Sequence, residues 1–158
     1  MNSSPSNAQD ILIELKNITS LKNMEAYIVG GYVRDLLTGR QSKDIDLLLP
    51  ENKILDLVKK IAAYFGATFY KMDAGRGFYR ILIHGDEGQI FTVDAVPLSG
   101  SIEENLAMRD FTINSLAIPL ANFDNLSDVI DFNGGVQDIK SKLIRYTRKD
   151  VFKKDPIR

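Results

Sequence analysis

Apolar residues along the chain follow two periods, one typical of helices and the other of strands. Spacings of three and four residues predict amphipathic helices over residues 11–21 and 51–65. Short apolar runs bounded by Gly, Pro, Asp or Asn predict strands over residues 26–29, 44–49, 67–72, 78–84, 90–96, 129–132 and 143–146. Strands interleaved with helices predict a mixed α/β sheet with helices packed against it.

Shorter segments complete the predicted order of elements. Residues 32–37 predict a short apolar helix, and Ser101 with Glu104 three positions later matches a capping box that begins another helix. After a break, residues 111–116 predict a second helical stretch. The Gly-rich turn over residues 85–88 joins the strands on either side of it into a hairpin.

Composition limits the chemistry that the chain can support. There is no cysteine and only one histidine, His84, which excludes disulfides, thiolate sites and a multi-histidine zinc site within one chain. A bound metal would therefore be held by oxygen, which favours Mg²⁺ or Mn²⁺. A net charge of −1 excludes a strongly basic protein that wraps nucleic acid. No apolar run reaches the length of a membrane span, and no signal peptide is recognisable, so we expect a cytoplasmic protein without a membrane partner.

A double glycine separates the strand over residues 26–29 from the short helix that follows. Gly30 and Gly31 either form only a tight turn or let the backbone approach a phosphate chain at the start of the helix. The G-x-G-x-x-G spacing of a dinucleotide site is absent. Arg34 either contacts phosphate or forms a structural ion pair with Asp35.

Three aspartates lie on predicted strands. Asp44 and Asp46 point to one face of their strand, while Ile45 between them points into the core. Two negative charges at the start of a buried strand are costly unless a cation compensates them, which favours metal binding over an uncompensated pair of carboxylates. Asp94 is either a buried structural residue or a third ligand. If its strand lies beside residues 44–49, the carboxylates meet and can hold two metal ions roughly 3.5–4 Å apart for an in-line phosphoryl displacement.

A second polar stretch begins at Arg109. Arg109 and Asn114 can contact phosphate and sugar, and Asp110 can accept a hydrogen bond from a ribose hydroxyl. Alternatively, Asp110 caps a helix and Arg109 is a surface residue. A basic loop carries Arg76, with Arg80 just beyond it. This loop either is solvated, as most loops are, or contacts RNA or phosphates.

Together these stretches resemble the head domain of class II tRNA nucleotidyltransferases (CCA-adding enzymes) and related bacterial poly(A) polymerases. The matching motifs are a G-G-x-V-R-D turn at 30–35, a D-x-D strand at 43–47, an R-D-F-T-x-N stretch at 109–114, a D-F-N-G-G segment at 131–135, and a tail at 152–158 similar to the E-D-x-x-R motif of the neck. The resemblance implies an α/β (α+β) nucleotidyltransferase, polymerase-β-like fold with a mixed antiparallel sheet. It implies a disordered segment over residues 1–7, a head domain over 8–147, and the start of a neck over 148–158.

The resemblance also assigns roles to individual residues. It implies that Asp44, Asp46 and Asp94 are catalytic and hold Mg²⁺ or Mn²⁺, with Asp94 the base for the primer hydroxyl. It implies nucleotide contacts from Gly30, Gly31, Arg34, Arg109, Asp110, Asn114, Asp155 and Arg158, the last two reading the base edge. Three positions depart from the family pattern, where Met108 replaces an arginine, Ser115 an alanine and Lys154 a glutamate.

The implied function is the template-independent addition of CMP and AMP from CTP and ATP to the 3′ end of tRNA. Poly(A) addition, or addition of only CC or only A, is the alternative within the family. A nucleotide- or RNA-binding module without catalysis is the alternative outside it. Because such enzymes continue into domains that carry the tRNA, we expect weak or no turnover from these 158 residues alone.

Overall fold

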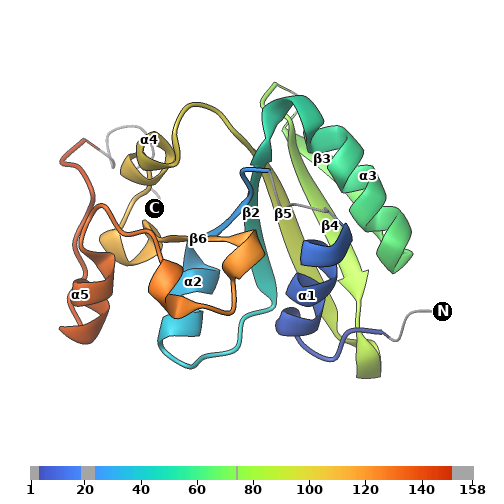
Figure 1. The fold of residues 1–158 in the computed structure, drawn as a ribbon, viewed down its shortest axis with the longest axis horizontal. Coiled ribbons are helices and arrows are strands. Elements are labelled where there is room, and N and C mark those ends of the chain that lie inside the picture. The colour runs from blue at the N-terminus through green and yellow to red at the C-terminus, as the bar shows by residue number, and fades with distance from the viewer. Residues whose placement is uncertain (1–3, 19–23, 74, 151–158) are drawn as a thin grey trace.

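The computed structural model describes residues 4–18, 24–73 and 75–150, which form a six-stranded sheet in the order β3-β4-β5-β2-β1-β6 (Figure 1). The strands are β1 (Tyr27–Val29), β2 (Asp44–Pro50), β3 (Thr68–Asp73), β4 (Phe78–His84), β5 (Ile90–Leu98) and β6 (Ala117–Pro119). Only β2 and β5 pair in parallel, and the other neighbours are antiparallel. The mixed α/β architecture predicted from the hydrophobic pattern is confirmed.

One face of the sheet is covered by two amphipathic helices, α1 (Ala8–Ile18) and α3 (Ile54–Phe65) (Figure 1). The side chains between them and the sheet are fully buried and include Ile11, Leu15, Ile45, Leu47, Val58, Ile61, Ile81, Ile83 and Val93. Each such side chain contributes about 1.5–3 kcal/mol by leaving water. The helix α3 ends at Gly66, whose left-handed backbone serves as the predicted stop.

The other face carries a smaller apolar cluster beneath helix α4 (Ile102–Ala107). Val29, Leu48, Leu106 and Ala117 form its buried part. The predicted capping box is present, since Ser101 and Glu104 each accept from the other's backbone amide. Because Ile45 and Leu47 face α1 and α3, the alternation of strand side chains directs Asp46 to this second, less covered face.

The predictions for the last third of the chain are partly wrong. Residues 111–116 form no α-helix, only the 3-10 turn Thr112–Asn114. The predicted strands over 129–132 and 143–146 shrink to single bridges, in which Ala117 pairs with Ile130 and Phe111 with Tyr146. The strand β6 was not predicted. These short apolar segments are fixed by partners far along the chain, which local periodicity does not encode.

Two helices and the N-terminal residues complete the description. The helices α2 (Gly31–Leu37) and α5 (Gly135–Lys140) flank the β1–β6 end of the sheet (Figure 1). Residues 4–7 belong to the segment expected to be disordered, yet Pro5 is buried and its carbonyl accepts from the Asp86 amide at 3.1 Å. Within the described ranges, every helix is too short or too polar to cross a membrane.

Candidate functional site

Two of the predicted carboxylates stand opposite each other on neighbouring strands. In the parallel β2–β5 pair, Asp46 is in register with Asp94, and Asp44 with Thr92. Cross-strand partners share a face and lie within side-chain reach. The condition set by the sequence, that the Asp94 strand lies beside the Asp44–Asp46 strand, is therefore met. Asp44 is exposed at the strand start, whereas Asp46 is half-buried.

The carboxylate of Asp46 lies close to both Gly30 and Arg109. A Cβ atom placed on Gly30 would stand 2.6 Å from Arg109 Nη1 and 3.1 Å from Asp46 Oδ2. Burial raises the pKa of Asp46 above its ordinary value, the Arg109 charge opposes this, and the Asp94 and Asp44 charges add to it. A bare backbone at Gly30 thus lets a cationic and an anionic side chain meet at the end of β1.

The helix α2 connects the double glycine with the second polar stretch. Gly30 precedes α2 with a φ of 75°, and Gly31 is its first residue. Arg34 Nη1 donates to Asn114 Oδ1 at 2.7 Å, so a residue from each predicted stretch is in direct contact. The Arg34 guanidinium also pairs with Asp35, with Nε at 2.9 Å and Nη2 at 2.8 Å from Oδ1. The structural ion pair considered from the sequence is therefore present.

The backbone of residues 109 and 110 is held from both sides. The Arg109 amide donates to the Leu106 carbonyl at 3.1 Å, and the Thr147 amide donates to the Asp110 carbonyl at 2.9 Å. The Thr147 hydroxyl donates to the Arg109 carbonyl. The Asp110 carboxylate accepts from the Phe111 amide at 2.8 Å. These bonds fix the backbone from which the Arg109 side chain extends to Gly30.

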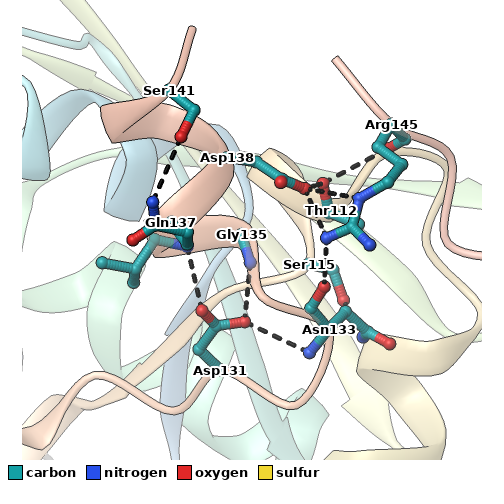
Figure 2. A network of polar contacts seen from close by, with 10 residues as sticks. Thr112, Ser115, Asp131, Asn133, Gly135, Gln137, Asp138, Ser141 and Arg145 are labelled. Carbon is teal, nitrogen blue, oxygen red and sulfur yellow. Dashed lines mark hydrogen bonds and ion pairs between the residues drawn. The ribbon is translucent and has the colours of Figure 1, made fainter. Parts of the chain in front are cut away.

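A polar network behind this segment fixes it to α5 (Figure 2). Asp138, whose side chain is 6% exposed, accepts from the Thr112 hydroxyl and from Arg145 Nε and Nη2 at 3.0 and 2.8 Å. The Thr112 hydrogen bond and then the Arg145 guanidinium hold the pKa of Asp138 below its usual range against the opposing effect of burial. Asp131 accepts from the amides of residues 135 and 136, the first two of α5, at 2.9 Å each.

Ser115, one of the departures from the family pattern, has a structural role that the sequence did not indicate. Its hydroxyl is fully buried, donates to the Leu106 carbonyl at 2.7 Å and accepts from Asn133 Nδ2 at 2.7 Å (Figure 2). An alanine at this position would make neither bond. The serine therefore joins the end of α4 to the segment before α5.

Arg80 is the residue of the site that sequence reasoning missed. From the sequence, Arg80 is only a residue beyond a loop that either is solvated or contacts RNA or phosphates. In the structure its Nε and Nη2 atoms donate to the two Asp94 oxygens at 2.7 Å each. Asp94 and, more weakly, Tyr70 raise the pKa of Arg80, while burial opposes them. A signal was available, because counting back from the hairpin turn, where His84 pairs with Ile90, places Arg80 opposite Asp94.

The donor set suits a hard cation in its chemistry but does not form a finished cage. Asp44, Asp46 and Asp94 supply oxygen ligands on one face, as Mg²⁺ and Mn²⁺ prefer. In the described part of the chain, however, no three carboxylate or imidazole side chains are gathered as a metal-binding group. Asp94 is engaged by Arg80 instead. Asp155 and Arg158 lie outside the described residues.

Comparison with known proteins adds independent findings. The family described as "Poly A polymerase head domain" matches residues 26–145. The chain is 38% identical over 84% of its length to a CC-adding tRNA nucleotidyltransferase of Geobacter sulfurreducens, and 34% identical over 85% to an A-adding tRNA nucleotidyltransferase of Aquifex aeolicus. It spans 29% and 17% of the length of these relatives. A solved CCA-adding enzyme with ATP superposes with a TM-score of 0.75 at 29% identity, covering 94% of this chain and 35% of that one.

Proposed function

Because the chain belongs to the family of the poly(A) polymerase head domain, we propose that it is the catalytic head of a template-independent RNA nucleotidyltransferase. It transfers CMP or AMP from CTP or ATP to the 3′ end of tRNA and releases pyrophosphate. Relatives named as CC-adding and A-adding tRNA nucleotidyltransferases support tRNA as the acceptor. A poly(A) polymerase of Salmonella typhimurium, 32% identical to the chain, keeps poly(A) addition as the second candidate. We propose that this activity takes place in the cytoplasm, where the enzyme would encounter its tRNA substrate.

The proposal rests on one observation. Asp46 is in register with Asp94, and Asp46 lies beside Gly30 and Arg109. Four segments distant in the sequence bring two carboxylates, an arginine and a bare backbone to one point. A structural ion-pair cluster would not need a residue without a side chain next to the carboxylates. A site for phosphoryl transfer needs all of these parts, since catalysis there is mostly positioning and charge stabilisation.

The residues divide into two groups by their place on the sheet. Asp44, Asp46 and Asp94 would hold Mg²⁺ or Mn²⁺, which when bound neutralises phosphate charge and activates the attacking hydroxyl. Arg109 lies on the β1 side of Asp46, where it would contact the phosphates. Through its bond to Asn114, Arg34 also belongs to this side.

The remaining site residues keep narrower roles in the proposal. Gly30 and Gly31 leave room for the triphosphate, and Asp110 and Asn114 would contact the ribose. Asp155 and Arg158 would read the base edge.

The test is addition of labelled nucleotides to a tRNA that lacks its 3′-terminal CCA. A polypeptide containing this chain is incubated with this tRNA, Mg²⁺ and labelled CTP or ATP. We expect extension that Asp46→Asn abolishes, because the neutral amide cannot balance a divalent charge. Asp56→Asn, the same change at an exposed position of α3 on the opposite side of the sheet, should extend as the unchanged protein does.

Two outcomes would contradict the proposal. If the unchanged protein adds no nucleotide, or Asp46→Asn adds as much as Asp56→Asn, the chain is not a nucleotidyltransferase of this mechanism. Mn²⁺-dependent nucleotide binding without any extension would support the binding module instead. CTP-only, ATP-only or repeated ATP incorporation would assign CC, A or poly(A) addition.

A further inference from the structure

A row of charged side chains crosses the sheet at a single level. Arg80 on β4 is in register with Asp94 on β5, and Asp94 is in register with Asp46 on β2. Asp94 therefore lies between a guanidinium on one side and a like-charged carboxylate on the other. The strand order β4-β5-β2 determines this arrangement, because each of these residues points to the same face.

Arg80 engages both oxygens of Asp94 at once. The two bonds are parallel and 2.7 Å long, from Nε to Oδ1 and from Nη2 to Oδ2. This two-point pairing, here called the fork, fixes the plane of the Asp94 carboxylate as well as its position. With side-chain exposures of 33% for Arg80 and 24% for Asp94, the pair is only partly screened by water.

The fork also explains why the carboxylates form no cage in the described part of the chain. Asp94 repels Asp46, and burial already penalises the charge on Asp46. The Arg80 guanidinium on β4 holds the Asp94 carboxylate on that side and balances its negative charge. A divalent cation that approaches Asp94 meets both a competing donor and a like charge.

We propose that the Arg80 guanidinium is the resident counter-cation of Asp94 and competes with the divalent cation for that carboxylate. The inference rests on the proposed function, in which Asp94 is a cation ligand. Cation binding withdraws at least one Asp94 oxygen from the fork, and the remaining hydrogen bond keeps the carboxylate on its strand. Arg80 is then a positioning residue. It lowers the affinity for the cation and fixes the orientation of the Asp94 carboxylate.

A Mn²⁺ titration of the chain followed by water-proton relaxation tests the inference without reference to turnover. We expect Arg80→Gln to bind Mn²⁺ about threefold or more tightly, because a nearby positive charge and a competing donor are removed. The matched control is Arg76→Gln, which makes the same charge change at a side chain that is 75% exposed and pairs only loosely with Asp73. Arg76→Gln should leave Mn²⁺ affinity unchanged, since exposed charges at a distance are screened.

Arg80→Lys serves as a second variant if the glutamine variant does not fold, which thermal unfolding would reveal. Lysine keeps the charge but not the two-point fork, so its Mn²⁺ affinity should lie between those of the unchanged chain and Arg80→Gln. In a polypeptide active in nucleotide addition, kcat should fall in Arg80→Gln although the cation binds more tightly. A purely structural ion pair predicts the opposite for the cation, with weaker Mn²⁺ binding and lower stability together.

The outcomes separate this inference from the proposed function. If Asp46→Asn leaves Mn²⁺ binding intact in the same titration, the cation site itself is wrong. If Asp46→Asn weakens binding while Arg80→Gln binds Mn²⁺ no more tightly than Arg76→Gln, only the competition by Arg80 is refuted. Where only the lysine variant folds, affinity equal to or below that of the unchanged chain refutes it.

Discussion

The close approach at Gly30 makes Gly30→Ala the most informative single change. Its backbone, at φ 75° and ψ −136°, lies in a region that residues with a Cβ rarely enter. The added methyl would stand 2.6 Å from Arg109 Nη1, where ordinary contact begins at 3.4 Å. Both the backbone and the neighbouring guanidinium must therefore give way.

The two costs can be separated with a second glycine. Strain at such a φ and ψ costs about 1–3 kcal/mol, and forcing a group into occupied space adds about 1 kcal/mol or more. We expect Gly30→Ala to lose at least about 2 kcal/mol of unfolding free energy, or about 4–8 °C in Tm for a chain of this size. Gly66→Ala at φ 60°, with no atom within 4 Å of the new Cβ, should lose only about 1–2 kcal/mol.

Urea unfolding followed by circular dichroism gives the stability, and titration with CTP or ATP in the presence of Mg²⁺ gives nucleotide binding. Gly30→Ala should weaken nucleotide binding because Arg109 is displaced from Asp46, whereas Gly66→Ala should not. The reasoning is refuted if the two variants lose equal stability and bind nucleotide equally well. A loss of stability without a loss of nucleotide binding would show that Arg109 does not contact the phosphates.

Two further predictions concern the network behind the site. The hydrogen bond from Thr112 and the charge of Arg145 hold the pKa of Asp138 below the ordinary 3.8. The Asp138 carboxylate therefore stabilises the fold above pH 3.8. This contribution is lost as the pH falls through the lowered pKa. Urea midpoints measured from pH 7 to pH 2 should therefore be lower for Asp138→Asn at pH 7 and converge with those of the unchanged chain in acid; a constant difference would contradict this. Ser115→Ala should lose about 1–3 kcal/mol, because it leaves the Asn133 amide and a buried carbonyl without their bonds. A change below about 0.5 kcal/mol in thermal unfolding, the range of a plain surface substitution, would refute this role of the serine.

Much of the fold follows from local patterns. The helix α3 is predicted with its stop at Gly66, and the strand β4 with the bounds that the structure shows. The hairpin between β4 and β5 follows from the turn between them. The helix expected over residues 111–116 is wrong because a buried apolar run looks alike in a helix and in an irregular segment.

The candidate site is predictable to a similar extent. The residue types and their alternation along the strands single out Asp46 and Asp94 from the amino-acid sequence alone. Arg109 is a candidate because it begins the second polar stretch. The ion pair that engages Asp94 has no motif of its own, and only the register counted back from the hairpin turn indicates that Arg80 lies opposite Asp94.

What the sequence determined by itself is therefore the local geometry and the available chemistry. The period of a strand sends Asp44 and Asp46 to one face, and the lack of cysteine leaves oxygen as the ligand for a metal. Beyond the β4–β5 hairpin, only the tertiary structure decided which strands are neighbours. The parallel pairing of β2 with β5 joins residues about fifty positions apart through a long connection, and it depends on packing across the whole sheet. That pairing sets Asp46 beside Asp94 and places Arg80 on the far side.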